Sequence, residues 1–172
     1  MYHYLEHFSG IGIKDVPTSD RNVMKLFTST EPIGVKPQDI GSETGTFGIP
    51  EMGTITSRKL LMEAQPQGVA DLIQISGLSH GTDVWDGNAQ DLIRDGIATL
   101  QTAICTRDDI MTYLISMGLD NEESFKIMEA VRKGKVAKGK EPNWEKWKQD
   151  MKDHDVPDWY IWSCEKIAYM FP

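Results

Sequence analysis

Residues 106–134, TRDDIMTYLISMGLDNEESFKIMEAVRKG, decide the fold class because they begin and end two helices in succession. Thr106 and Asp109 have the spacing of a capping box, in which side chains bond the free backbone N–H groups of a helix start. Gly118 is a natural C-terminal stop. Asp120, with a glutamate three residues later, repeats the box, and Gly134 ends the second helix. The predicted helices cover residues 106–117 and 121–133.

Further helices are predicted on both sides of this pair. Apolar spacing and stop residues place them at residues 20–28, 56–64, 69–75, 89–95, 144–152 and 158–170. The first follows the cap oxygens of Thr18-Ser19-Asp20, and the helix that begins at residue 69 is expected to stop at Ser76-Gly77.

Glycine and proline are dense over residues 31–53, which predicts irregular backbone with at most a short strand at residues 46–49. Residues 76–85 form the most unusual loop, because it is polar, contains glycine and is closed by Trp85. The predicted fold class is therefore mainly α: a multi-helix region with irregular Gly/Pro-rich loops and at most a short β element.

Charge is segregated along the 172 residues. The whole chain has a formal net charge of −8, yet six basic residues and a single acid lie between positions 126 and 140. The basic residues are Lys126, Arg132, Lys133, Lys135, Lys138 and Lys140. Such a patch can attract phosphate while the acidic remainder discourages indiscriminate binding. The alternative is a solvated charge run, with cations favourably placed near a helix C-terminus.

Two cysteines, Cys105 and Cys164, lack partners at zinc-site spacing and are too few for a disulfide framework. Buried free thiols in a reducing cytoplasm are therefore expected. No stretch approaches the ~20 apolar residues that span a bilayer, and the N-terminus lacks a signal pattern. These features predict a soluble, cytoplasmic protein that does not contact the membrane.

Few other residues suggest chemistry. Asp108 and Asp109 fit helix capping better than a metal site, whereas Arg107 could reach an anion at the helix N-terminus. His3 and His7 have the i, i+4 spacing of metal ligands but lack a third ligand. His80 either bonds a phosphate or base or closes its own turn. The remaining expectations concern structure: His154 at a helix end, and packing rather than base stacking for Trp144, Trp147, Trp159 and Trp162.

Several segments together resemble the PolC-type α subunit of bacterial DNA polymerase III, the replicative polymerase of low-GC Gram-positive bacteria. The matches run in the same order over nearly the whole chain. The segments are TGTFGIPE (residues 44–51), ISGLSHGTDVW (75–85), RDDIM (107–111), FKIME (125–129), VRKGK (131–135), HDVPDWY (154–160) and YMFP (169–172).

The resemblance implies a part of the fingers region. The family's palm, which holds two Mg²⁺ ions on aspartates, would lie upstream, so no catalytic residue and no metal ligand is assigned to this chain. Residues 1–65 would be palm-proximal helices with the Gly/Pro-rich loop, and residues 66–135 nucleotide-facing helices. Residues 136–172 would form the basic loop and the Trp-rich C-terminal helices. Implied partners are the incoming dNTP, template-primer DNA, the palm, the replisome and the sliding clamp.

The resemblance also implies roles for single residues. Arg107 and Lys126 would contact the triphosphate, supported by Arg132 and Lys133. The remaining assignments place Ser76, Ser79 and His80 near the nascent base pair, Tyr169 and Phe171 beside the sugar and base, and Lys135, Lys138 and Lys140 on DNA. The sequence departs from the family at Asp86, where an apolar residue is usual, and in residues 136–143, which are longer and more basic.

Two other functions stay open from the sequence. A free-standing helical DNA-binding module would use the basic residues to hold duplex phosphates. A protein-interaction domain would dock a partner on the Trp-rich helices.

Overall fold

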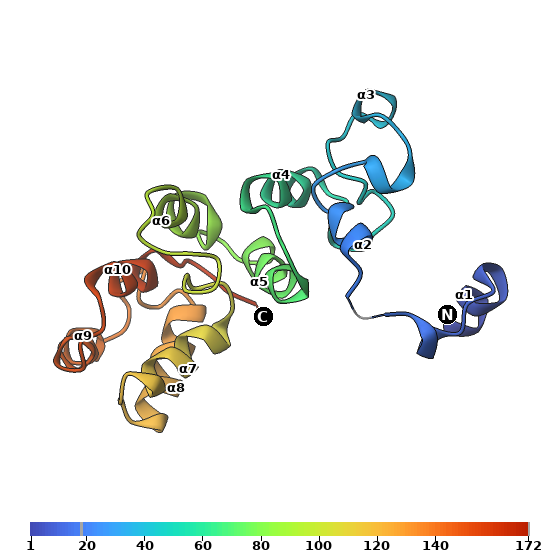
Figure 1. Ribbon diagram of the computed structural model, residues 1–172. Helices are drawn as coiled ribbons and strands as arrows, with labels where there is room; N and C mark the ends of the chain where they lie inside the picture. The colour runs from blue at the N-terminus through green and yellow to red at the C-terminus, as the bar shows by residue number, and fades with distance from the viewer. Residues whose placement is uncertain (18, 172) are drawn as a thin grey trace. The chain divides into compact units, whose positions relative to one another are not determined.

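A computed structural model describes residues 1–17 and 19–171, and it is mainly helical (Figure 1). The predicted fold class is confirmed. Two predicted features fall partly outside the described residues, since Thr18 belongs to the predicted cap and Pro172 to the last motif. The chain forms two compact units, Met1–Val69 and Ala70–Pro172.

The first unit consists of short helices and turns. Its elements are α1 (Tyr2–Ser9), η1 (Ile13–Asp15), α2 (Arg21–Lys25), η2 (Glu31–Ile33), α3 (Pro37–Ile40) and α4 (Ile55–Ala64). Asp20 caps α2 as predicted, because its carboxylate accepts the backbone N–H of Asn22 at 2.7 Å and of Val23 at 3.0 Å. The α-helix ends earlier than residue 28, and residues 26–28 continue it as a turn.

The short strand predicted at residues 46–49 is wrong, since these residues form turns. Buried hydroxyl groups hold them in place. Thr46 Oγ1 donates to the carbonyl of Met52 at 2.7 Å and lies 2.9 Å from Thr44 Oγ1. Side chains that bond nearby backbone compete with a strand ladder. The loop is therefore fixed locally, without a neighbouring strand.

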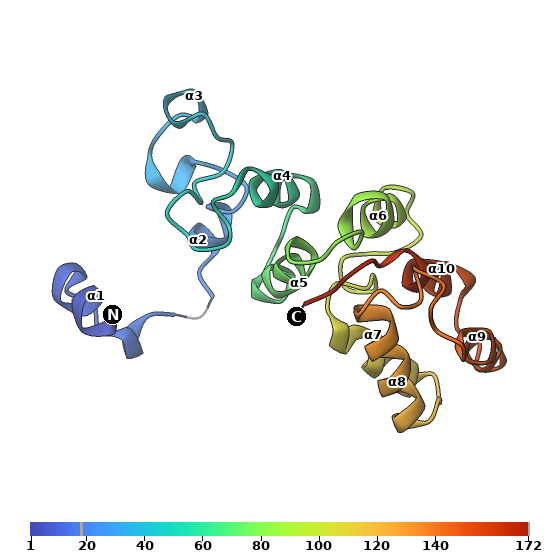
Figure 2. The same cartoon turned by 180° about the vertical axis from the view of Figure 1, so that it is seen from behind.

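The second unit carries the longer helices, beginning with α5 at the boundary between the two units. Its elements are α5 (Val69–Ser79), the wide π-type turn η3 (Trp85–Ala89), α6 (Gln90–Arg94), α7 (Arg107–Ser116), α8 (Asn121–Arg132), α9 (Trp144–Asp153) and α10 (Asp158–Lys166). Both views show α7 and α8 side by side (Figure 1, Figure 2). Their core residues Ile110, Leu114, Ile127 and Val131 are completely buried.

The capping box predicted at the start of α7 forms in full, whereas at the start of α8 only the half supplied by Asp120 forms. Thr106 Oγ1 accepts the N–H of Asp109, and Asp109 Oδ2 accepts the N–H of Thr106 at 2.7 Å. Asp120 accepts the N–H groups of Glu122 and Glu123 at the start of α8. Because only four residues connect the helices, α7 and α8 run antiparallel, and the start of α7 lies at the same end as the finish of α8.

The predicted stop at Ser76-Gly77 is wrong, because α5 continues through both residues to Ser79. Gly77 is needed for packing rather than for ending the helix. A Cβ on Gly77 would collide with the carbonyl of Cys105 and lie 2.7 Å from Cγ2 of Thr106. Glycine thus lets the backbone of α5 touch the segment that begins α7.

The helix predicted over residues 158–170 is too long, since α10 ends at Lys166. Residues 168–170 are instead extended and pair with two other segments. Tyr169 forms an antiparallel bridge with Thr82, and the N–H of Met170 donates to the carbonyl of Arg132 at 2.9 Å. These long-range bonds replace the helical ones.

Two further interior features agree with the sequence. Cys105 and Cys164 are buried free thiols, and burial raises the pKa of both well above its ordinary value, so neither is a reactive thiolate. Trp144 and Trp147 are buried, as predicted for packing residues, whereas Trp159 and Trp162 are half-buried.

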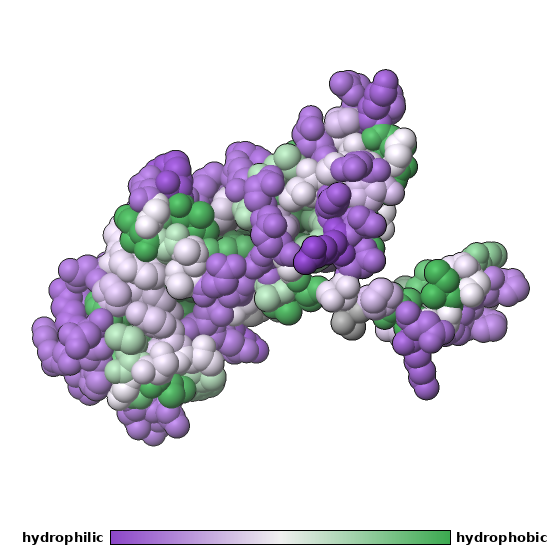
Figure 3. Space-filling model, viewed as in Figure 1, coloured by the Kyte–Doolittle hydropathy of each residue, from purple (hydrophilic) through white to green (hydrophobic). Residues whose placement is uncertain are grey.

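The surface of the second unit differs from helix to helix. Figure 3 shows hydrophilic side chains over α9 and a hydrophobic group over α6. Among residues 1–17 and 19–171, none of the helices combines the length and apolar content that crossing a lipid bilayer requires.

Candidate functional site

Most of the residues expected to bind nucleotide lie at one end of the second unit. Ser76, Ser79 and His80 lie at the end of α5, which touches the start of α7 through Gly77. Arg107 is the first residue of α7 and is exposed. The close contact between α5 and Thr106 therefore brings Arg107 beside the end of α5.

The C-terminal segment joins this end to α8. The N–H of Thr82 donates to the carbonyl of Tyr169 at 2.8 Å, and the next residue, Met170, bonds the carbonyl of Arg132. Exposure alternates along the segment as in a strand, with Tyr169 43% exposed, Met170 1% and Phe171 66%. Both aromatic rings thus face outward beside the end of α8.

Two glycines permit this arrangement, and both were missed as contributors to the site. A Cβ on Gly134 would collide with the carbonyl of Ala168, and one on Gly81 would lie 2.9 Å from the carbonyl of Tyr169. Gly134 also has a φ of +66°, which favours glycine. The only signal in the sequence was the glycines themselves, which end helices just as often as they allow close backbone contacts.

The cations of α8 are paired with acids of the same helix. Lys126 Nζ lies 2.6 Å from Glu122, and Lys133 Nζ lies 2.6 Å from Glu129. Arg132 donates two hydrogen bonds to the same Glu129 carboxylate, one from Nε and one of 3.1 Å from Nη2. Lys126 and Lys133 thus belong to one stripe of alternating charge, which agrees with the predicted shared face.

Glu129 is the centre of this arrangement. Hydrogen bonds from Arg132 and Lys133 lower the pKa of the Glu129 carboxyl from 4.5 to about 2. The same pairing raises the pKa of Arg132, with a smaller contribution from Tyr169. Arg132 and Lys133 are therefore held in fixed positions, and an anion that binds them shares them with Glu129.

Four other candidate cations have no acidic partner in the described part of the chain (residues 1–17 and 19–171). These are Arg107, Lys135, Lys138 and Lys140. The three lysines lie on or next to successive turns after α8. The side chain of Val136 is buried, with 6% of its surface exposed, and this anchors the turns. Their ammonium groups therefore project from a held loop rather than from a free tail.

Lys126 lies apart from the others. It precedes Arg132 by six residues, which is about 9 Å along a helix that rises 1.5 Å per residue. The structure thus places the end of α5, Arg107, Arg132, Lys133, Tyr169 and Phe171 at one end of the unit, and Lys126 farther along α8.

The acids near Arg107 serve the helix. Asp109 Oδ2 accepts N–H groups of Cys105 and Thr106, so the prediction of capping is confirmed for Asp109. Within residues 1–17 and 19–171 no group of three or more metal-binding side chains comes together. The predicted helix-end position of His154 is confirmed, since it caps α9.

The Ser79 hydroxyl and the His80 backbone N–H form hydrogen bonds within the end of α5. Ser79 Oγ donates to the carbonyl of Ser76 at 2.9 Å, which closes the last turn of the helix. His80 is exposed and its backbone N–H bonds the carbonyl of Gly77.

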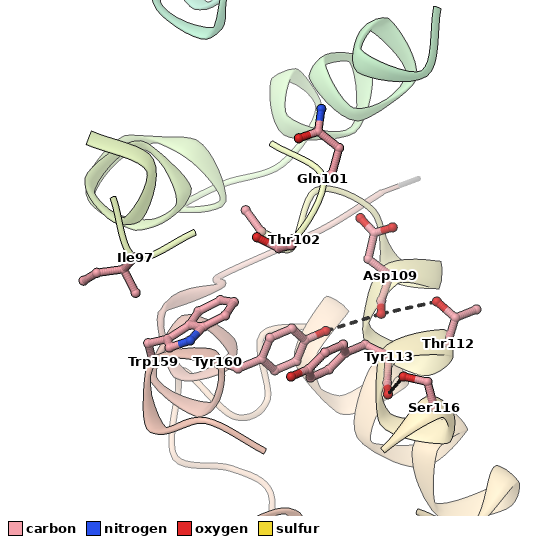
Figure 4. Close-up of a pocket in the computed structure, with 10 residues that line it drawn as sticks. Ile97, Gln101, Thr102, Asp109, Thr112, Tyr113, Ser116, Trp159 and Tyr160 are labelled. Atoms are coloured by element: carbon pink, nitrogen blue, oxygen red, sulfur yellow. Dashed lines mark hydrogen bonds between the residues drawn. The ribbon is translucent and has the colours of Figure 1, made fainter. Parts of the chain in front are cut away.

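A separate cavity of about 440 Å³ lies beside α7 and α10 (Figure 4). The rings of Tyr113 and Tyr160 stack there with their centroids 4.2 Å apart, and Tyr160 Oη donates to the carbonyl of Asp109 at 3.3 Å. Burial raises the pKa of both phenols. Lysine and arginine are absent from its described lining, so a phosphate would find no cation there.

Comparison with known proteins shows which family the chain matches. Residues 3–155 match the family model described as the bacterial DNA polymerase III alpha subunit finger domain. Similar curated proteins include the PolC-type DNA polymerase III of Lactococcus lactis subsp. lactis (strain IL1403), which is 57% identical over 172 residues. That alignment covers 100% of this chain and 10% of the relative.

Two further relatives agree. The PolC-type DNA polymerase III of Caldanaerobacter subterraneus subsp. tengcongensis is 52% identical over 168 residues, covering 98% of this chain and 12% of the relative. The PolC-type DNA polymerase III of Bacillus subtilis (strain 168) is 55% identical over 168 residues, covering 98% of this chain and 11% of the relative. The chain spans about a tenth of the length of these relatives.

Proposed function

Because the chain belongs to the bacterial DNA polymerase III alpha subunit finger domain family, we propose that it positions the incoming deoxynucleoside triphosphate and the template-primer during DNA synthesis. The supporting observation is the gathering of Arg107, Arg132 and Lys133 with exposed Tyr169 and Phe171 at one end of the second unit.

The chemistry of the ligand fits this gathering. A triphosphate carries several negative charges and binds guanidinium forks and ammonium groups, while a base stacks on aromatic rings. Arg107 is the strongest candidate for direct contact, because it is exposed, has no acidic partner in the described residues and lies at a helix N-terminus. Arg132 and Lys133, which are bonded to Glu129, would support Arg107 in binding the triphosphate. Lys126 would reach a more distant phosphate.

The end of α5 would face the base pair. Ser76, Ser79 and His80 lie next to the Thr82–Tyr169 bridge, so a base beside Tyr169 or Phe171 would also lie near these polar groups. Lys135, Lys138 and Lys140 would then follow the phosphate backbone of the DNA.

Catalysis in such an enzyme depends on positioning and on charge stabilisation rather than on a nucleophile from the protein. The palm of the parent polymerase would hold Mg²⁺, and the cations of this chain would keep the triphosphate in line with the primer. Partners in the proposal are the palm, the replisome and the sliding clamp, in the cytoplasm.

Replacing Arg107 in a complete PolC-type polymerase tests the proposal. For Arg107→Ala we expect KM for nucleotide to rise about tenfold or more, since a hydrogen bond to a charged group is worth roughly 1.5–3 kcal/mol. Arg94→Ala is the matched control, because Arg94 is also an exposed arginine of the second unit, paired with Asp91 and Asp95. An unchanged KM for Arg107→Ala would exclude the triphosphate contact.

A further inference from the structure

One motif of the sequence, residues 44–51, has no role in the proposed function, yet its backbone is tightly held. Thr44 and Thr46 are fully buried, and their hydroxyls bond each other. The N–H of Gly45 donates to the carbonyl of Leu26 at 2.9 Å. A rigid loop of this kind holds whatever side chain it exposes in one orientation.

The side chain that the loop exposes is aromatic. Phe47 is 52% exposed, although the threonine just before it is completely buried. Its backbone is pressed against Gly53, where a Cβ would lie 2.7 Å from the carbonyl of Phe47. An exposed phenylalanine on a preorganised loop resembles the stacking surfaces that bind bases of single strands.

An arginine from α4 covers one side of this ring. The guanidinium carbon of Arg58 lies 4.2 Å from the centroid of Phe47, and its Nη1 is 3.5 Å from the carbonyl of Gly41. Its Nε is buried without a hydrogen-bond partner. A guanidinium has five N–H donors, and those of the two Nη atoms that do not bond Gly41 are left for a ligand.

The surroundings favour an anion as that ligand. Arg58 lines a cavity of about 310 Å³ together with Lys59, Ser42 and Glu43. No ion pair with an acid holds Arg58 among residues 1–17 and 19–171, and Lys59 is 3.7 Å from Glu63 and highly exposed. Glu43 in the same cavity opposes an anion and Glu63 shares Lys59, so Arg58 is the cation that would hold the anion.

We propose that Phe47 and Arg58 form a second nucleic-acid contact, which binds one nucleotide of single-stranded DNA. The base stacks on the exposed face of Phe47, and the adjoining phosphate bonds the guanidinium of Arg58, with Lys59 as a further cation. Arginine suits this position better than lysine, because its planar fork can stack on the ring and bond two phosphate oxygens at once.

The identity of the ligand as DNA rests on the proposed function, but the site is separate from the residues of the second unit. The test uses the 172-residue chain and NMR spectra that resolve the Arg58 Nε–H group and the Phe47 amide. We expect a short oligothymidylate to shift both signals saturably. Inorganic phosphate, at matched phosphate concentration, lacks the base and is expected to bind at least tenfold more weakly.

Variants separate the contribution of the stacked base to binding from that of the phosphate contact. Phe47→Ala and Arg58→Ala should each weaken oligonucleotide binding roughly tenfold, since one stacked base or one phosphate fork is lost. Phe47→Trp should restore binding, and Arg58→Lys should restore it only in part. Arg21→Ala is the matched control, because Arg21 is an exposed arginine of the same unit. Circular dichroism checks that each variant is folded.

Two results would overturn the inference. One is an oligonucleotide that shifts signals only in residues 70–171, which would leave the proposed function intact. The other is equal binding of inorganic phosphate and the oligonucleotide with no effect of Phe47→Ala, which would reduce the site to an anion site. Failure of the proposed function is measured separately, by nucleotide KM in the Arg107 variant.

Discussion

At the scale of single residues, Glu129 decides how the basic segment behaves. It lies between Arg132 and Lys133 and bonds both, so the apparent excess of positive charge at the end of α8 is partly neutralised. Among the candidate nucleotide-binding and DNA-binding cations, Arg107 and the three lysines after α8 have no acidic partner in the described residues, so they are the ones most available to phosphate. Competition between Glu129 and a triphosphate would also favour a highly charged ligand over a single phosphate.

Replacing this acid should change stability in a pH-dependent way. The pKa of Glu129 is lowered to about 2, so its contribution is present above its ordinary pKa of 4.5 and is lost as the pH falls towards 2. We expect Glu129→Gln to lower the free energy of unfolding by about 1–2 kcal/mol at pH 7 and by much less at pH 3. Urea denaturation at both pH values measures the difference.

A matched control for this measurement is Glu145→Gln. Glu145 pairs with Lys148 across 3.4 Å and is 85% exposed, so its loss should cost about 0.5 kcal/mol or less. An equal loss for Glu129→Gln at pH 7 and pH 3 would contradict the ion-pair account.

These ion pairs are predictable from the sequence. Glu122 with Lys126 and Glu129 with Lys133 have i, i+4 spacing, which predicts ion pairs on a helix. The position of Phe47 against Arg58, in contrast, depends on how a loop and a helix meet, and spacing along the chain does not encode that contact.

At the scale of helices and loops, features set by neighbouring residues were predicted correctly. Features set by long-range contacts were not. The capping box of α7 and the Asp120 cap of α8 were predicted correctly because they depend on residues two or three positions apart, although the Glu123 half of the second box does not form. The ends of α5 and α10 were predicted wrongly, since Gly77 packs on Thr106 and residues 168–170 pair with Thr82 and Arg132. Tertiary contacts there outweigh the local preference of the backbone.

The C-terminal segment should be sensitive to the glycine beneath it. Gly134→Ala would collide with the carbonyl of Ala168 and must also adopt a φ of +66°. We expect it to lower the free energy of unfolding by about 2–4 kcal/mol. Gly139→Ala is the matched control, because Gly139 has a φ of +62° but open space around it, so only about 1 kcal/mol is expected.

Chemical denaturation of the two glycine variants separates backbone strain from collision. If both variants lost the same stability, the close approach of residues 134 and 168 would not matter, and the segment carrying Tyr169 and Phe171 would have to be held by other contacts.

At the scale of the whole molecule, the chain is two compact units that divide the proposed contacts between them. The second unit gathers cations and aromatic rings for a nucleotide, and the first unit has the Phe47–Arg58 pair. The sequence alone indicated the family and the helical class, whereas the convergence of α5, α7, α8 and the C-terminal segment required the structure.

Photoaffinity labelling of a complete PolC-type polymerase tests the central claim most directly. The enzyme, bound to template-primer, is irradiated with 8-azido-dATP opposite a template thymine, and labelled peptides are identified by mass spectrometry. The account predicts label within residues 76–82 or at Tyr169 or Phe171, and its loss in the presence of excess dATP. Label confined to parts of the polymerase outside residues 70–171 would contradict the claim that this unit positions the incoming nucleotide.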